Sequence, residues 1–157
     1  MGRLFDAVSS LAGVRHEVTY EAQAAIELEA LVDDAAAGTY RFAVDGGSVP
    51  FRIDPSPVVA AAADDIRAGA AAGTVATRFH RAVISMMVEV AERLQQHHGI
   101  ATVGLSGGVF QNVRIASAAR QRLEAAGFVV ATHHQVPPND GGLALGQAVV
   151  AARMQGR

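Results

Sequence analysis

The sequence predicts a single domain of the α/β class, and three observations support that class. Of the 157 residues, 50% are hydrophobic, which is enough to bury one core without disulfides or a structural metal. After residue 100, two apolar segments of strand length are each followed by a turn and a helical pattern, as in α/β construction. No repeat, low-complexity linker or shift in composition divides the chain. We therefore treat residues 1–157 as one domain.

The first half of the chain is predicted to be mostly helical. Apolar residues at helical spacing predict helices over residues 2–13 and 20–38, each of which ends at a glycine. Because the first helix starts with no strand or cap before it, we expect the chain to be a segment of a longer protein. Alternating apolar and polar residues on both sides of Asp45-Gly46-Gly47 predict a β-hairpin.

Two further helices and an α/β unit complete the predicted order. Residues 55–72 and 74–98 have helical patterns, and the second segment carries an apolar stripe that includes Phe79, Val83 and Met86. A methionine at this spacing indicates core packing. Residues 100–105 and 128–134 are predicted to be buried strands, followed by helices over residues 110–126 and 140–153.

Composition excludes several functional classes. A net charge of -2 and a pI of about 6.3 leave no basic surface for nucleic acid and no charged run for an anionic membrane. No apolar run approaches the roughly 18 residues of a membrane span, and no export signal is evident at the N-terminus. The absence of cysteine excludes thiolate catalysis and fits a reducing compartment, so we expect a cytoplasmic protein. All 13 residues counted as Lys+Arg are arginine, which excludes a Walker-type lysine and a Schiff base.

The stretch Gly104-Leu105-Ser106-Gly107-Gly108 fits two kinds of chemistry. Its G-x-S-x-G pattern is that of a nucleophilic serine on a strand-to-helix turn. A hydrolase of that type has its acid and then its histidine after the serine, because the histidine must reach the serine oxygen while the acid orients it. Here no histidine follows Asp140, the only aspartate after Ser106, and this order argues against the nucleophile.

The same stretch also fits an anion site. Gly107 and Gly108 have no side chain to block close approach and can adopt positive φ, and the helix that follows presents free N–H groups. Asn112, one turn into that helix, could reach a phosphate or sugar oxygen. The alternative is a turn that merely joins strand to helix, and the pattern alone leaves both interpretations open.

A second constellation, VPPNDGGLALGQA, surrounds Asp140. The prolines end the preceding strand, Asn139 or Asp140 can cap the next helix, and small residues such as Gly146 form a face for close packing. Asp140 is therefore a helix cap or, at the carboxyl end of the sheet, a cation ligand, although one carboxylate does not hold a metal alone. Among the histidines, His80 fits a partly buried, hydrogen-bonded side chain better than a ligand.

Five segments in this order resemble one family: GRLFDAV, YEAQAAIELE, RFHRAV, LSGGVFQN and VPPNDGGLALGQA. They are similar to the C-terminal end of the HypF-type hydrogenase-maturation carbamoyltransferases, and the likeness covers nearly the whole chain. The resemblance implies an actin-like ATPase fold (ribonuclease H-like), of which this chain is mainly the second lobe. It also implies use of carbamoyl phosphate and ATP to make carbamoyl adenylate, and transfer of the carbamoyl group to a C-terminal cysteine of a HypE-type partner.

The resemblance also implies roles for individual residues. Contacts with ATP or carbamoyl adenylate are expected from Asp6, Glu21, Gly107, Gly108 and Asn112. Asp140 is expected to ligate a divalent metal, iron or zinc. The family pattern has glycine where Ala22 stands. The upstream domains of the family, including the first lobe with its histidine ligands, are absent from this sequence, so we expect no complete carbamoyl transfer by this chain alone. The alternative is a module that associates with itself or with the missing first lobe.

Overall fold

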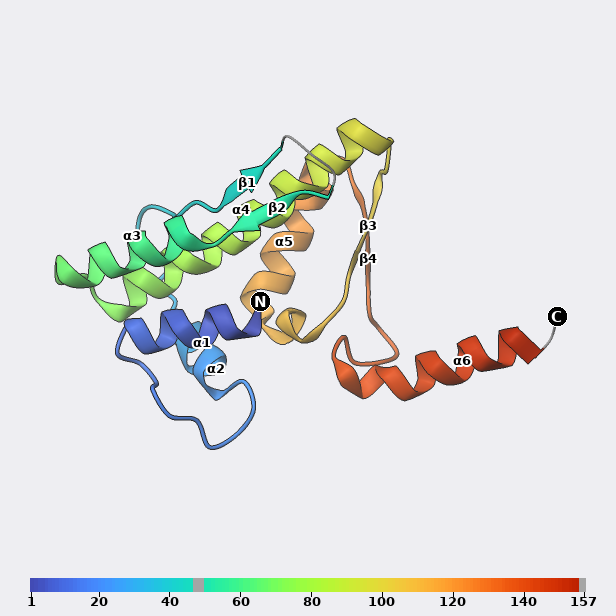
Figure 1. The fold of residues 1–157 in the computed structure, drawn as a ribbon, viewed down its shortest axis with the longest axis horizontal. Coiled ribbons are helices and arrows are strands. Elements are labelled where there is room, and N and C mark those ends of the chain that lie inside the picture. The colour runs from blue at the N-terminus through green and yellow to red at the C-terminus, as the bar shows by residue number, and fades with distance from the viewer. Residues whose placement is uncertain (47–49, 156–157) are drawn as a thin grey trace.

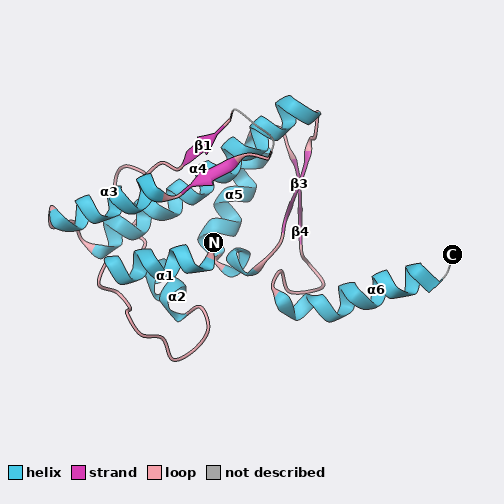
Figure 2. Cartoon of the chain, viewed as in Figure 1, coloured by secondary structure: helices cyan, strands magenta, loops and turns pink. Residues whose placement is uncertain are grey.

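The computed structural model describes residues 1–46 and 50–155, and helices dominate it (Figure 2). A group of helices forms one side of the molecule, a pair of strands leads away from it, and the last helix extends to the other side (Figure 1). The elements in chain order are α1 (Gly2–Leu11), α2 (Gln23–Ala30), β1 (Ala43–Asp45), β2 (Arg52–Asp54), α3 (Ser56–Arg67), α4 (Ala72–His98), β3 (Thr102–Leu105), the 3-10 helix η1 (Gly108–Gln111), α5 (Val113–Ala125), β4 (Val129–Thr132), the 3-10 helix η2 (Asp140–Gly142) and α6 (Leu143–Gln155).

The core is centred on α4, which contacts α1, α2, α3 and α5. Its predicted apolar stripe is confirmed, because Phe79 and Val83 are fully buried and Met86 is 7% exposed. The Phe5 ring of α1 packs edge-on against Phe79, with ring centroids 4.8 Å apart. Burying large apolar side chains from several helices in one cluster is the main favourable contribution to such a fold. This core holds the N-terminal ends of α1, α2 and α5 close together.

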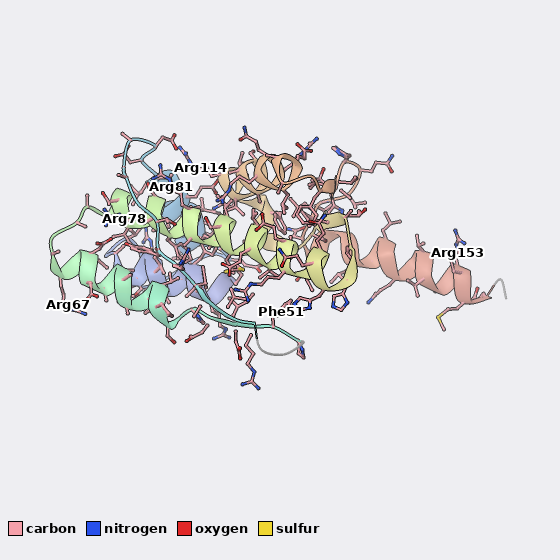
Figure 3. All side chains as sticks on the ribbon, turned by 90° about the horizontal axis from the view of Figure 1, so that it is seen from above. Phe51, Arg67, Arg78, Arg81, Arg114 and Arg153 are labelled. Atoms are coloured by element: carbon pink, nitrogen blue, oxygen red, sulfur yellow. The ribbon has the colours of Figure 1, made fainter. Side chains whose placement is uncertain are left out.

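The predicted helix over residues 20–38 is too long, because α2 ends at Ala30. The chain then crosses α4, where polar side chains of α4 form hydrogen bonds with its backbone groups. Thr77 accepts a hydrogen bond from Asp33 N and donates to Asp33 O, and Arg78 Nε donates to Ala37 O. Arg78 and Arg81 lie beside this loop, whereas Arg153 projects from α6 at the other end of the molecule (Figure 3). These long-range hydrogen bonds replace the helical ones that the local pattern predicts.

The other N-terminal expectations agree with the structure apart from their ends. The helix at the start of the chain is confirmed as α1, and α3 stops at Arg67, five residues before the predicted end. Gly69, with φ +81°, turns the chain into α4. The hairpin is confirmed as an antiparallel pair in which Ala43 faces Asp54, while Gly47 of its predicted turn lies outside the described residues.

The two later strands pair in parallel, as α/β construction requires, with Thr102 opposite Val129 and Leu105 opposite Thr132. The expectation that they are buried is wrong. Only alternate residues face the core, so Leu105 is buried while Val129 is 64% exposed. A sheet of two strands with α5 packed on β4 has one covered face, and side chains of period two alternate between that face and the solvent.

The last helix lacks the close packing that its small residues predict. Within the described chain α6 contributes no buried residue, and a Cβ added at Gly146 meets nothing within 4 Å. Its apolar side chains are exposed instead, from 55% at Val149 to 73% at Met154. The surface that would cover this helix is therefore not supplied by the described residues.

Candidate functional site

The loop after β3 is a sharp turn in which the two glycines differ. Gly107 adopts φ +105°, a conformation that disfavours any other residue, and a Cβ at Gly108 would meet open space. Of the two glycines that can adopt positive φ, Gly107 does so. The amide of Gly107 donates to Pro138 O at 2.6 Å, so this N–H is not free to bind an anion. Both glycines have open space where a Cβ would lie, but only Gly107 has a backbone conformation that disfavours a side chain.

Asn112 is the N-cap of α5 and does not lie one turn into a helix. The helix predicted from residue 110 begins at Val113, after the single 3-10 turn of η1. Asn112 Oδ1 accepts a hydrogen bond from Ile115 N at 2.9 Å, which is the usual way that asparagine caps the N-terminus of a helix. Its Nδ2 lies 2.9 Å from His80 Nε2 of α4. The free N–H groups expected at the start of the following helix are therefore displaced by three residues, from residue 110 to Val113, and partly capped.

A cavity of about 270 Å³ lies between α1, α2 and the loop after β3, and we call it the α1–α2 cavity. Its wall includes Phe5, Ala22, Glu29, Gly108 and Asn112. Gly108 and Asn112, two of the residues predicted to line a nucleotide, are thus brought together at one cavity. Ala22, the last residue of the loop that precedes α2, also belongs to this wall.

Asp6 and Glu21 are adjacent in sequence to residues of the cavity wall, but neither belongs to the wall itself. Asp6 follows Phe5 on α1 and Glu21 precedes Ala22, and both side chains are exposed. Ala22 adopts φ +63°, and it is the one residue other than glycine with positive φ among the residues that the structure describes. This left-handed conformation explains why glycine suits the position. The family's glycine is therefore the sequence signal for the backbone conformation found at Ala22.

Hydrogen bonds hold the segment before α2 in place. Gln23, which is 7% exposed, accepts from Thr19 N at 2.8 Å and donates from Nε2 to Glu27 Oε1 at 2.9 Å. Arg15 forms two hydrogen bonds to the same Glu27 carboxylate, at 2.8 and 2.7 Å. The side-chain hydrogen bond from Arg15 is the main cause that lowers the pKa of Glu27. This network positions Ala22 at the mouth of the α1–α2 cavity.

A second pocket, of about 870 Å³, lies between the ends of β3 and β4 and the apolar side of α6. We call it the α6 pocket, and it is lined by Ser106, Gly107, His133 and Asp140 together with α6 side chains. Ser106 Oγ and His133 Nε2 are 2.9 Å apart. The order argument missed this contact, although parallel pairing carries its signal: Leu105 faces Thr132, so the residues that follow them meet.

Asp140 lines this pocket and is exposed at the start of η2. The residue that caps η2 is Asn139. Asn139 Oδ1 accepts from Gly141 N at 3.1 Å. A Cβ at Gly142 would lie 3.1 Å from Pro137 O, a tight contact, so a side chain there would require a small shift of this turn. Across residues 1–46 and 50–155, no group of three or more His, Asp or Glu side chains is arranged to hold a metal ion. Asp140 is therefore not part of a group of three such ligands in the described chain.

The residues implied for one site are divided between the two cavities. Gly108 and Asn112 line the α1–α2 cavity, Gly107 and Asp140 line the α6 pocket, and the bond between the two glycines joins these walls. The α6 pocket lies beyond the carboxyl ends of the two parallel strands, which is the edge of the sheet where open α/β folds bind ligands.

Comparison with known proteins identifies the lobe. Residues 1–147 match the family profile "Carbamoyltransferase, Kae1-like Domain, second subdomain". The chain therefore belongs to the HypF-type carbamoyltransferases and corresponds to the second subdomain of their Kae1-like domain. It superposes on a full-length HypF solved in the phosphate- and nucleotide-bound form with a TM-score of 0.92 and 37% identity, covering 98% of this chain and 20% of that one. The actin-like α/β fold class is thereby confirmed.

Curated relatives agree with this assignment. The carbamoyltransferase HypF of Synechocystis sp. is 34% identical over 100% of this chain and 20% of its own length. The HypF of Rhodobacter capsulatus is 38% identical over 96% of this chain and 19% of its own. The chain thus spans about a fifth of the length of these relatives. Within its described part, no helix has the length and apolar character to cross a membrane.

Proposed function

We propose that this chain is the nucleotide-facing lobe of a carbamoyltransferase site that uses carbamoyl phosphate and ATP. The carbamoyl group passes through carbamoyl adenylate to the C-terminal cysteine of a HypE-type protein, in the maturation of a hydrogenase. One observation carries the proposal: Gly108 and Asn112 line a cavity beside α1 in a fold that superposes on a nucleotide-bound HypF.

Each proposed contact follows from the chemistry of its side chain. The exposed Asp6 carboxylate accepts hydrogen bonds from ribose hydroxyls, as acidic residues do in other nucleotide sites. Glu21 precedes Ala22 of the cavity wall, and its carboxylate accepts a hydrogen bond from the same ribose. Gly108 lets the nucleotide approach the backbone, and Asn112 donates from its amide to a sugar or phosphate oxygen. Gly107 acts by shaping the turn, since its amide is bound to Pro138 O.

Asp140 is proposed as one metal ligand, and the donor set of this chain does not complete the site. A divalent iron or zinc ion needs several ligands, and one exposed carboxylate holds it weakly. We derive no chemical step through a metal. The proposal includes companion ligands from the first lobe of the intact protein, so the isolated chain is expected to perform no complete carbamoyl transfer.

Calorimetry with adenylyl imidodiphosphate, an ATP analogue, tests the proposal. We expect weak binding by this chain, with a dissociation constant of about 1 mM, since contacts from a second lobe do not contribute. Asp6→Ala should weaken it at least about tenfold, because one hydrogen bond to a charged group is lost. Asp64→Ala is the matched control, since Asp64 is an exposed carboxylate on α3 that pairs with Arg67. Tight binding that survives Asp6→Ala would contradict the assignment.

The second candidate is an assembly module, and the exposed apolar face of α6 favours it. Val149, Val150 and Met154 are 55%, 59% and 73% exposed on a helix with no buried residue in the described chain. A contiguous apolar surface of this kind marks an interaction site. Light scattering separates the candidates: a dimer that ignores the ATP analogue and dissociates in Val150→Glu supports assembly. A monomer that binds the analogue supports the nucleotide lobe.

A further inference from the structure

His80 lies at the junction of α1, α4 and α5, where it contacts Phe5, Ala76 and Asn112. The side chain is 2% exposed, and its ring packs edge-on against Phe5, with centroids 5.5 Å apart. Its Nδ1 is 2.7 Å from Ala76 O, one turn earlier on α4. Phe5 lines the α1–α2 cavity, so the imidazole lies directly behind that wall. None of the roles proposed above uses this buried histidine.

The hydrogen-bond partners determine the tautomer of His80. Ala76 O is an acceptor only, so Nδ1 must carry the proton. Asn112 Oδ1 accepts from Ile115 N, so the group that faces His80 is the Asn112 Nδ2 amide, a donor. Nε2 of His80 must therefore accept, and the ring must be neutral. An imidazolium would set two donors against each other at 2.9 Å.

The orientation of Asn112 consequently has two determinants, one from each end of its carboxamide. The backbone of α5 holds the oxygen, and His80 holds the nitrogen. Nδ2 carries two protons, and the hydrogen bond to His80 uses one of them. Asn112 lies in the wall of the α1–α2 cavity, where the second proton is available to a ligand oxygen.

We propose that His80 is a positioning residue of the α1–α2 cavity, which accepts a hydrogen bond from Asn112 Nδ2 and so aims the remaining amide proton at a nucleotide oxygen. This inference rests on the proposed function for its ligand, while the hydrogen bond itself stands on the geometry alone. His80 does not touch the nucleotide.

The charges around His80 bear on the pH at which it holds Asn112. Burial lowers the pKa of His80, its hydrogen bond to Ala76 raises it, and Glu29 of α2 and Arg114 of α5 act in opposite directions. The net shift is downward, so the ring is neutral at neutral pH, in agreement with the tautomer. On acidification the donor–donor conflict should release Asn112.

Nuclear magnetic resonance on the isotope-labelled chain tests the hydrogen bond without any nucleotide. The ring nitrogens of His80 should report protonated Nδ1 and unprotonated Nε2. On acidification the side-chain amide of Asn112 and the backbone amide of Ile115 should shift with the midpoint of His80. An Asn112 amide that does not follow this titration would overturn the proposal. The test uses the unmodified chain, so it does not depend on a variant that folds.

A second arm measures affinity for adenylyl imidodiphosphate in His80→Gln and His80→Phe. Glutamine presents an acceptor oxygen to Asn112, whereas phenylalanine fills the site without one. We expect binding within about twofold of the parent for glutamine and weakened about fivefold or more for phenylalanine, the effect of one hydrogen bond. His98→Gln on the exposed end of the same helix is the matched control.

The two arms separate the failure of this inference from that of the proposed function. If the resonances of His80 and Asn112 are coupled but the parent chain binds no nucleotide, the hydrogen bond stands and the proposed function and the ligand-positioning role fail. If the parent binds and both His80 variants bind equally well, the positioning role is overturned. Equal loss in both variants also overturns it, because that result indicates packing.

Discussion

Replacing Ala22 by glycine should stabilise this protein. Ala22 has φ +63°, and an L-residue with a side chain pays about 1–2 kcal/mol for a left-handed backbone conformation. Glycine removes that strain but adds about 0.5–1 kcal/mol of backbone freedom to the unfolded chain. Ala22 is exposed, so loss of its methyl group removes little burial. The difference predicts a gain of about 0.5–1 kcal/mol.

Urea denaturation followed by circular dichroism measures this gain. In a chain of this size, 1 kcal/mol corresponds to a rise in Tm of about 2–4 °C, so thermal melting gives a second readout. Ala60→Gly is the matched control, because Ala60 is an exposed residue inside α3. There glycine should cost about 0.5–1 kcal/mol. Equal destabilisation by the two substitutions would refute the reasoning, since it would mean that Ala22 is not strained.

Three other predictions concern hydrogen-bonded polar side chains. Since burial lowers the pKa of His80 below its ordinary 6.5, the folded state resists its protonation. The free energy of unfolding should therefore be highest above pH 6.5 and fall on acidification through the folded-state pKa of His80. The contribution of His80 is at most about 1.4 kcal/mol per pH unit. Urea melts of His80→Gln should lack this contribution. Asn112→Ala should cost about 1 kcal/mol through loss of the α5 cap, whereas Asn112→Ser, which can still cap Ile115 N, should melt closer to the parent. Tyr40→Phe should cost about 1 kcal/mol in urea melts, because the Tyr40 hydroxyl donates to Asp65 at 2.6 Å.

Each of the last three predictions has a result that contradicts it. Unfolding free energy that rises as the pH falls below 6.5 would show that His80 is stabilised when charged. Equal stability of Asn112→Ala and Asn112→Ser would exclude the cap.

For Tyr40→Phe, the pKa of Asp65 is a further readout. Burial alone would raise it, but hydrogen bonds from Tyr40 and Arg78 lower it overall, so it should rise in the variant. An unchanged pKa of Asp65 in Tyr40→Phe would show that the Tyr40 hydroxyl does not stabilise the Asp65 carboxylate.

The fold was predictable wherever the signal is local. The apolar spacing in α4 identifies a helix whose stripe contains Phe79 and Val83, and both are buried. The same kind of pattern fails over residues 31–38, where the apolar spacing continues but Thr77 and Arg78 of α4 capture the backbone. Periodicity reports which face of a segment is apolar. It does not report which distant side chain competes for the hydrogen bonds of that segment.

The candidate site shows the same division. Resemblance of the motifs identifies Gly108 and Asn112, and the structure brings both to one cavity. Sequence reasoning gave Gly107 the same role, but its amide is taken by Pro138, 31 positions later in the chain. The contact of Asn112 with His80 joins residues separated by 32 positions, and no spacing rule anticipates it. The nucleotide contacts expected from Asp6, Glu21, Gly107, Gly108 and Asn112, and the metal contact expected from Asp140, stay predictions that binding measurements must test.

By itself, the sequence determined the class of the fold, the family, and the elements whose periodicity or turn residues are local. Short-range sterics and propensity act within a few residues, and this range is what a pattern records. Only the tertiary structure decided which face of each strand is covered, which amide of the glycine pair is engaged, and which histidine orients Asn112. Those outcomes depend on groups that are brought together from distant parts of the chain by burial of the core.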